Sequence, residues 1–381
     1  MVPAQRISAP KVMRCMESEM RRGLLFIFAL AVGAPASCER SRPKTGADSG
    51  NKGAVQQVRP APAASRVAVS IFPVYDLVRR VAGSDFEVVL ALPPGQPVVG
   101  HRPTAAVLQT LASAQLGIAV GMDVDAWFDQ ALRSAAKQRI RVIHLTDHVT
   151  LRRYGERELS DAQRKNAWHE HGDGLHQHAH DRGKAMIRGY DHVHGTVHGH
   201  GHGHEHAQDD EPPPPPDPHF WTDPARMADA LGAIASSLGQ LRPALRPAFE
   251  QRAARLSAML GRLRQTIEGA AGPWRKRTVA AGRSDLGYLA DRLRLTIAGV
   301  AATAVSAHDR HHLGRRLQRA KAAAVLTTAT AHDSNSEVAT ALAGEMGAPL
   351  VEVDLLGGTT DSDRYERTVM RNIRRLAHAL R

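Results

Sequence analysis

The stretch Val67-Ala-Val-Ser-Ile-Phe-Pro-Val-Tyr-Asp-Leu-Val-Arg-Arg-Val-Ala-Gly83 decides the fold of this chain. Its first six residues are a short, mostly apolar run that stops at Pro73, which predicts a buried strand. Apolar residues then recur at helical spacing up to Gly83, namely Val74, Leu77, Val78 and Val81. A strand that leads directly into a helix is the first half of a parallel β/α unit.

The same alternation of strand and helix occurs twice along the chain. In the first half we expect strands at residues 67–72, 86–92, 115–120 and 140–145 and a helix at 104–112. In the second half we expect strands at residues 278–281, 295–300, 322–327 and 349–353, with helices between them. The sequence therefore predicts an α/β fold of two β/α lobes, each built on a parallel sheet.

A long helical stretch separates the two halves. Asp223-Pro224 is a helix start, and apolar residues at helical spacing follow up to residue 241. After an interruption, residues 247–268 continue the pattern for about 33 Å at 1.5 Å per residue. We predict a stiff linking helix within residues 242–270, between a first lobe at 66–241 and a second lobe at 271–381. The alternative is a bundle helix packed within one lobe.

Composition excludes several classes of protein. Hydrophobic residues are 43% and charged residues 23%, so neither chain-wide disorder nor a polytopic membrane protein is expected. The net charge is +12, but the arginines are scattered and no nucleic-acid reading motif is present, so we expect no nucleic-acid partner. The chain has no His-Glu-x-x-His, no Gly-x-Ser-x-Gly and no phosphate-binding Gly-rich loop, so we expect no enzyme.

The N-terminus reads as an export signal over residues 1–37. Arg21 and Arg22 precede an apolar run of about nine residues, too short for the roughly 20 that span a bilayer. Ala34-Pro35-Ala36 suits ordinary cleavage, whereas Ala36-Ser37-Cys38 suits a lipoprotein box in which Cys38 is acylated. We favour the lipoprotein, since Cys38 would be the one cysteine left and could form no internal disulfide.

Residues 38–65 follow the signal and lack an apolar period, as a flexible tether does. The protein is therefore expected on the extracytoplasmic side, either periplasmic or membrane-anchored. It would touch the membrane only through the possible lipid at its N-terminus.

A histidine-rich insertion is the strongest chemical signal. Of 21 histidines, 12 lie between His169 and His206, in a segment (166–216) that we predict to be a disordered loop. Neutral imidazole suits zinc, copper and nickel, so such a loop would collect these ions weakly; a functionless low-complexity expansion is the alternative. The candidate loop ligands are His192, His194, His198, His200, His202, His204 and His206.

The order of these features resembles a known family. An export signal, two α/β lobes, a long linking helix and a histidine-rich loop just before Asp217-Pro-His-Phe-Trp-Thr-Asp-Pro224 resemble the periplasmic solute-binding component of a high-affinity zinc-uptake ABC transporter. Ser70-Ile-Phe-Pro73, Leu92-Pro-Pro-Gly95 and Val120–Trp127 resemble further motifs of that family. The resemblance implies one Zn²⁺ bound in a cleft between the lobes and handed to an ABC permease with its ATPase. Histidine richness favours zinc over manganese.

The resemblance also assigns cleft positions. Family members typically hold the ion with three histidines and one carboxylate, two ligands from each lobe. The positions of His219 and Asp354 retain a ligand, whereas the other two fall on Val99 and Arg283. His101, two residues beyond Val99, is the expected substitute third ligand.

His332, after a predicted strand, is a possible ligand too, although an exposed loop residue is the other interpretation.

The substitutions at the two altered positions are chemically severe. Val99 has no donor atom, and a guanidinium stays protonated with no lone pair to offer. Arg283 about 4 Å from a dication would cost about 8 kcal/mol at an effective dielectric of 20. Either Arg283 turns away, or it pairs with Asp354 and the cleft holds no tight metal. The first hypothesis is a zinc-delivery protein whose lobes tilt slightly; the second is a metal-buffering or interaction paralogue that has lost tight cleft binding.

Overall fold

The computed structural model describes residues 65–135, 140–159, 213–274, 276–304, 306–328, 334–360 and 363–380, all within one compact unit. The predicted signal, Cys38, almost all of the tether, the loop histidines and His332 lie outside the described residues. No helix in the described ranges is both long and apolar enough to cross a membrane.

Each lobe is built on four parallel strands, as predicted. The first sheet has the order β2-β1-β3-β4 and consists of β1 (Arg66–Val69), β2 (Glu87–Leu90), β3 (Ala114–Ala119) and β4 (Arg141–His144). The second has the order β6-β5-β7-β8 and consists of β5 (Thr278–Ala281), β6 (Thr296–Val300), β7 (Val325–Thr328) and β8 (Leu350–Val353). In both orders the chain reverses its direction of travel between the two central strands, where ligands bind in open α/β sheets.

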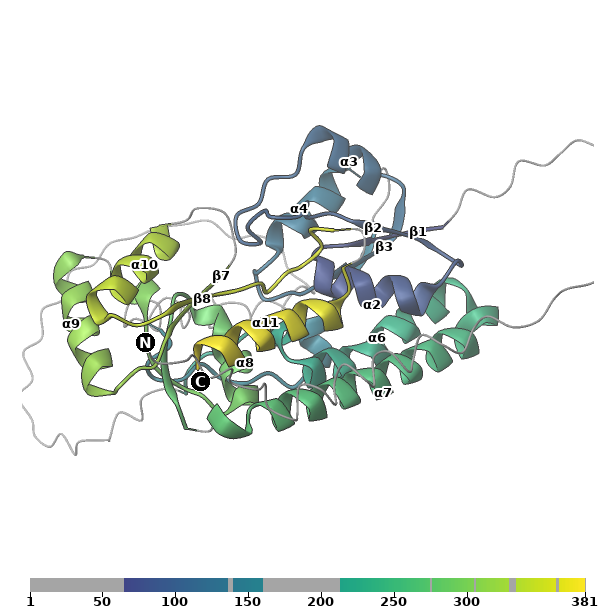
Figure 1. The fold of residues 1–381 in the computed structure, drawn as a ribbon. Helices are drawn as coiled ribbons and strands as arrows, with labels where there is room; N and C mark the ends of the chain where they lie inside the picture. Colours follow the sequence, from purple (N-terminus) through teal and green to yellow (C-terminus); the bar gives the residue numbers. More distant parts are fainter. Residues whose placement is uncertain are drawn as a thin grey trace, which may run out of the picture. The chain divides into compact units, whose positions relative to one another are not determined.

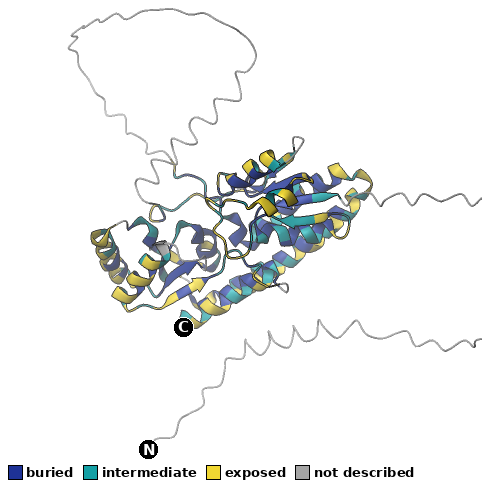
Figure 2. Ribbon diagram, turned by 90° about the horizontal axis from the view of Figure 1, so that it is seen from above, coloured by how far each residue is buried: buried dark blue, intermediate teal, exposed yellow. Residues whose placement is uncertain are grey.

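Helices cover the sheets of both lobes (Figure 1). Those of the first lobe are α2 (Phe72–Ala82), α3 (Ala105–Leu111), α4 (Ala126–Ala135) and α6 (Pro224–Leu241). Those that follow the linking region are α8 (Gly287–Leu293), α9 (Ala307–Arg319), α10 (Ser334–Met346) and α11 (Tyr365–Ala379). Buried residues lie along the sheets and the inward sides of these helices, while the outward sides are exposed (Figure 2).

The linking helix α7 (Arg246–Ala270) begins after a short 3-10 turn, Pro243–Leu245. It packs on α2 and α6 of the first lobe and on α8 and α11 of the second (Figure 1). Its 25 residues extend for about 37 Å, and one face is buried from end to end. The helix therefore spans both lobes instead of belonging to a bundle within one. The buried residues are Phe249, Ala253, Leu256, Leu260, Leu263 and Ile267.

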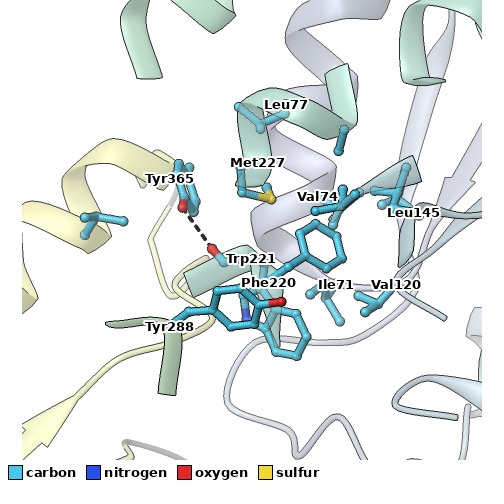
Figure 3. Packing of buried hydrophobic residues seen from close by; sticks show 14 of the residues in the cluster. Ile71, Val74, Leu77, Val120, Leu145, Phe220, Trp221, Met227, Tyr288 and Tyr365 are labelled. Carbon is cyan, nitrogen blue, oxygen red and sulfur yellow. Dashed lines mark hydrogen bonds between the residues drawn. The ribbon is translucent and has the colours of Figure 1, made fainter. Parts of the chain in front are cut away.

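The larger hydrophobic cluster includes residues of both lobes, and aromatic side chains connect its two parts. Phe220 and Trp221 come from the first lobe, and Tyr288 and Tyr365 from the second (Figure 3). The Tyr365 hydroxyl donates to the Trp221 carbonyl at 2.8 Å, and the Trp221 indole donates to the Leu355 carbonyl at 3.2 Å. This seam fixes the lobes against each other beside the strand ends that form the candidate site.

A buried carboxylate strengthens the same seam. Asp76 on α2 is fully buried and accepts from the backbone N–H of Tyr365, the first residue of α11, at 3.1 Å. Arg79 and Arg80 also donate to it, and Arg80 continues to Glu366 of α11 at 2.9 Å. An anion at a helix N-terminus is favourable because the first N–H groups have no partner within the helix.

Replacing Asp76 by asparagine should therefore weaken the contact between the lobes. We expect Asp76→Asn to lower the free energy of unfolding by about 2–3 kcal/mol, because a buried charge network loses its shared anion. Urea denaturation measures this, and Asp229→Asn, which removes only an exposed pair with Arg226, should stay within about 0.5 kcal/mol of the parent. Equal midpoints for both variants would contradict this role of Asp76.

Candidate metal site

A cavity of about 390 Å³ lies between the ends of the two sheets. Val99, Val124 and His219 line it from the first lobe. The second lobe contributes, among others, Arg283, Asp285, Thr328 and Asp354. All four positions at which the resemblance places a metal ligand therefore line this one cavity.

Parallel-strand topology explains this convergence. Arg283 follows β5, Thr328 ends β7 and Asp354 follows β8, and the carboxyl ends of parallel strands share one edge of the sheet. In the first lobe the turn after β3 is shaped by Asp125, whose carboxylate accepts from the N–H groups of Val120 and Gly121 at 2.6 and 2.9 Å. Burial raises the pKa of Asp125.

His219 is held as a metal-binding histidine would be. Its Nδ1 lies 2.8 Å from Oδ1 of Asp217 and 3.2 Å from the hydroxyl of Tyr154. A carboxylate that accepts a hydrogen bond from Nδ1–H favours the tautomer with its lone pair on Nε2, which is the arrangement that orients metal-ligating imidazoles. Trp221 packs against the ring, with centroids 5.1 Å apart. The Nε2 lone pair of His219 is therefore available to a metal ion in the cavity that this residue lines.

Asp217 is itself clamped by an arginine. The side chain is fully buried, and its Oδ2 accepts from Nη1 of Arg152 at 2.9 Å. Arg152 also pairs with Glu158 at 2.7 Å and, through Nε, with Asp291 of α8 in the second lobe at 2.8 Å. Burial by itself lowers the pKa of Arg152, but Glu158, Asp291 and Asp217 together outweigh that effect and the pKa is raised. The guanidinium therefore stays charged and remains paired with Asp217.

The base of the histidine-rich insertion is built into this arrangement. Arg153 and Pro216 form an antiparallel bridge, the Tyr154 N–H donates to the Pro215 carbonyl, and the Asp217 N–H donates to that of Arg152. Arg152 and Tyr154 thus lie on the outgoing strand of the stem and Asp217 on the returning one. The described segments on either side of the insertion, residues 152–154 and 215–217, thus lie together beside His219.

Asp354 lines the cavity, but its carboxylate is already paired with an arginine. Its Oδ1 accepts from the N–H groups of Leu356 and Gly357 at 3.1 and 2.7 Å. Its Oδ2 accepts from Nη2 of Arg371, on α11, at 3.0 Å. Within the described ranges the arginine paired with Asp354 is therefore Arg371, whereas the sequence suggested Arg283.

Arg283 pairs with a different carboxylate. Its Nε donates to Oδ2 of Asp285 at 3.0 Å. The other oxygen of Asp285, Oδ1, is buried and accepts no hydrogen bond within the described part of the chain. Asp285 was not singled out from the sequence, although a carboxylate two residues from a position expected to hold a ligand was the available signal.

His101 does not join His219 and Asp354, which corrects the expectation of a third ligand there. It lines a separate hollow with Trp127, with ring centroids 4.7 Å apart. The indole of Trp127 donates to the Val98 carbonyl at 2.7 Å, which holds this loop so that Val99 lines the cavity while His101 packs on the indole. Burial lowers the pKa of His101, as expected for a packed neutral ring.

Among the residues that the structure describes, the cavity brings together two of the family's ligands, His219 and Asp354. In the part of the chain that the structure describes, no three His, Cys, Asp or Glu side chains are grouped closely enough to hold an ion. Two arginine–carboxylate pairs lie where a tight site would need open carboxylates. The arrangement can hold a divalent ion through His219 once carboxylate oxygens are released from their arginines.

Comparisons with known proteins agree with this fold. Residues 67–379 match the model of the family described as zinc-uptake complex component A, periplasmic (ZnuA). The zinc-binding lipoprotein AdcA of Streptococcus pneumoniae is 22% identical over 188 residues, which are 49% of this chain and 29% of that relative. The chain thus spans less than a third of the length of the curated relative that it matches.

Solved structures show the same architecture. A crystal structure of ZnuA is 17% identical with a TM-score of 0.61, covering 84% of this chain and 100% of that one. The solute-binding protein FpvC of Pseudomonas aeruginosa, in complex with Mn²⁺, is 16% identical with a TM-score of 0.61, covering 83% and 98%. At these identities the likeness concerns the fold.

The Arg152 clamp leads to a prediction about Gly287. A Cβ on Gly287 would clash with Nη1 of Arg152. The guanidinium cannot easily move away, because Glu158 and Asp217 bind Nη1 and Asp291 binds Nε. We expect Gly287→Ala to lower the free energy of unfolding by about 2 kcal/mol, because the buried Asp217 would lose its cation.

Gly261→Ala is the matched control for thermal or urea denaturation. A Cβ there meets nothing within 4 Å, so alanine should stabilise the helix by up to about 1 kcal/mol. If Gly287→Ala were also stabilising, Arg152 would not be confined as described.

Proposed function

Because the chain belongs to the family of the periplasmic zinc-uptake complex component A, we propose that it binds zinc or a similar divalent transition metal outside the cytoplasm and delivers it to an ABC permease and its ATPase. The observation that carries the proposal is His219, oriented by the buried Asp217 in a cavity that Asp354 also lines. The ion is cargo, bound and released unchanged, and we propose no catalytic step.

The donor set that we propose combines an imidazole with two carboxylates. Nε2 of His219 is the nitrogen donor, and Asp354 and Asp285 are the oxygen donors, since all three line the cavity and Oδ1 of Asp285 accepts no hydrogen bond among the described residues. Three protein ligands with water in the fourth position are typical of sites that exchange their ligands. Val99 contributes no donor.

Binding in this site requires Arg283 and Arg371 to give way. A dication attracts the carboxylates more strongly than a single guanidinium does, and each arginine is partly exposed, so that water can take over its hydrogen bonds. Small movements of the second lobe along α7 would bring the carboxylates to His219. Reversal of those movements would release the ion to the permease.

The proposal also assigns roles to the N-terminus and to the histidine-rich insertion. We propose that the signal at residues 1–37 exports the chain and that an acylated Cys38 holds it to the membrane, as the lipoprotein relative AdcA suggests. We also propose that the histidine-rich insertion collects ions weakly. Its stem supports this role, since Tyr154 and Asp217, on the segments before and after the insertion, both contact His219.

A second function is favoured by the two arginine–carboxylate pairs. If Arg371 and Arg283 keep Asp354 and Asp285, the cleft holds no tight ion, and the protein acts as a metal buffer or interaction paralogue through its insertion. The two functions predict opposite results for a protein without the insertion.

Calorimetric titration with Zn²⁺ separates them. The stem brings the ends of the insertion together, so residues 162–210 can be replaced by a short Gly-Ser link. Under zinc delivery this variant binds one equivalent tightly, and adding His219→Ala weakens that tight binding at least about 100-fold, or 2.7 kcal/mol.

His378→Ala, a change at an exposed histidine on α11, is the control and should leave the affinity unchanged. Loss of the tight site in the shortened protein, with weak binding retained by the full chain, would identify the buffer instead.

The Arg371–Asp354 pair leads to a further prediction about affinity. Arg371→Gln removes a guanidinium that competes for Asp354, so we expect the shortened protein to bind Zn²⁺ at least about tenfold more tightly. Arg374→Gln, at an exposed neighbour on α11, should change the affinity much less, because it tests net charge alone. An equal gain in both variants would show that Arg371 acts only through the overall charge.

A further inference from the structure

A second group of histidines lies on α9 of the second lobe, outside the cavity between the sheets. His308, His311 and His312 are all exposed, and none lines that cavity. The buried side of α9 consists of Leu313, Gly314 and Leu317, whose leucines pack in the smaller hydrophobic cluster with α10. A ligand can therefore reach these imidazoles without disturbing the core.

The start of α9 fixes where these side chains lie. The Ser306 hydroxyl accepts from the Asp309 N–H at 3.1 Å, and the Asp309 carboxylate accepts from the Ser306 N–H at 3.1 Å. This capping box sets the first turn of the helix. His308 and His312 are four residues apart, so they lie on one face, one turn from each other.

The two rings are already in contact. Their centroids are 4.3 Å apart and the ring planes are inclined at 67°. His311 lies farther away, 6.4 Å from His312 between centroids, and is displaced around the helix by about 100° from it. The pair is thus His308 and His312, and His311 does not complete it.

We infer that His308 and His312 form a surface site for a divalent transition ion of the zinc, nickel or copper type, with water in the remaining coordination positions. Imidazole is the ligand that these ions share. Because no group of three metal-ligating side chains occurs among the described residues, the site has two protein ligands and exchanges its ion readily. This site is independent of the proposed cleft site.

Nearby cations set the strength of this site. Nη2 of Arg315 lies 3.3 Å from Nδ1 of His312, and a neutral ring has one lone pair, so an ion bound through Nε2 must displace this contact. Since the arginine also repels a dication, added salt should strengthen binding by screening.

Site-resolved histidine modification tests the inference in the full chain. Diethyl pyrocarbonate acylates free imidazole, and trypsin cleavage after Arg310 places His308 on a different peptide from His311 and His312. Mass spectrometry therefore reads His308 separately, and fragmentation of the next peptide distinguishes His312 from His311. We expect Zn²⁺ to protect both. At about nine times the dissociation constant the reaction of His308 should slow about tenfold, since a tenth of the sites remain free.

Variants show whether the two residues act as a pair. In His312→Ala the zinc concentration that half-protects His308 should rise at least about tenfold, while His311→Ala and His378→Ala leave it unchanged. Alanine favours the helix, so α9 should persist in these variants. His219→Ala should leave protection of His308 intact, which separates this site from the cleft. Reaction of His308 unaffected by zinc, or protection that survives in His312→Ala, would overturn the inference.

Discussion

The carboxylate of Asp217 is the interaction on which the rest of the site depends. It is fully buried between a guanidinium and an imidazole, accepting from Arg152 at 2.9 Å and facing Nδ1 of His219 at 2.8 Å. A buried anion is stable only when cations and donors surround it. This single requirement ties together the stem of the insertion, the ligand position of the first lobe and, through Asp291, helix α8 of the second.

The cleft is distinguished by the arginines that pair with its carboxylates. Arg283 and Arg371 each engage a carboxylate that could otherwise face an ion, so the two pairs are close to neutral in charge. A cavity without excess negative charge attracts a dication less than one lined by open carboxylates. Affinity in this protein should therefore depend on how easily two ion pairs open. Because both arginines are partly exposed, water can solvate them once they are released, which lowers the free-energy cost of opening the pairs.

The connections between the lobes limit how that opening can occur. Helix α7 packs on both lobes along its length, and α11 begins on the buried Asp76 of α2. The Trp221 and Tyr365 bonds lie in the same seam. Large rotations would break this network, whereas small shifts of the side chains at the strand ends break few of these bonds. The loop that carries Asp354 is itself held by the bond from the Trp221 indole to the Leu355 carbonyl. A short adjustment of side chains and loops is the motion that suits this molecule.

Several features could be predicted from the amino-acid order, because they depend on local patterns. Short apolar runs followed by helical periodicity predicted two parallel α/β lobes, since a buried parallel strand and an amphipathic helix each leave a pattern within a few residues. The Asp217-Pro-His219 motif and Asp354 were identified through the resemblance, and both positions line one cavity. The Asp217 carboxylate, two residues before His219, was also within reach of sequence reasoning.

Other features were decided only by tertiary structure. The pairing of Asp354 with Arg371, the clamp from Arg152 and the packing of His101 on Trp127 join residues between 17 and 65 positions apart, and no local period marks such contacts. His101 shows the reason most clearly, since a histidine two residues from a ligand position looks equivalent in the sequence. One hydrogen bond from the Trp127 indole to the Val98 carbonyl holds the loop that carries both residues. Local sequence thus determined the elements and the chemical types at their ends, while the packing of distant side chains determined which of those groups meet.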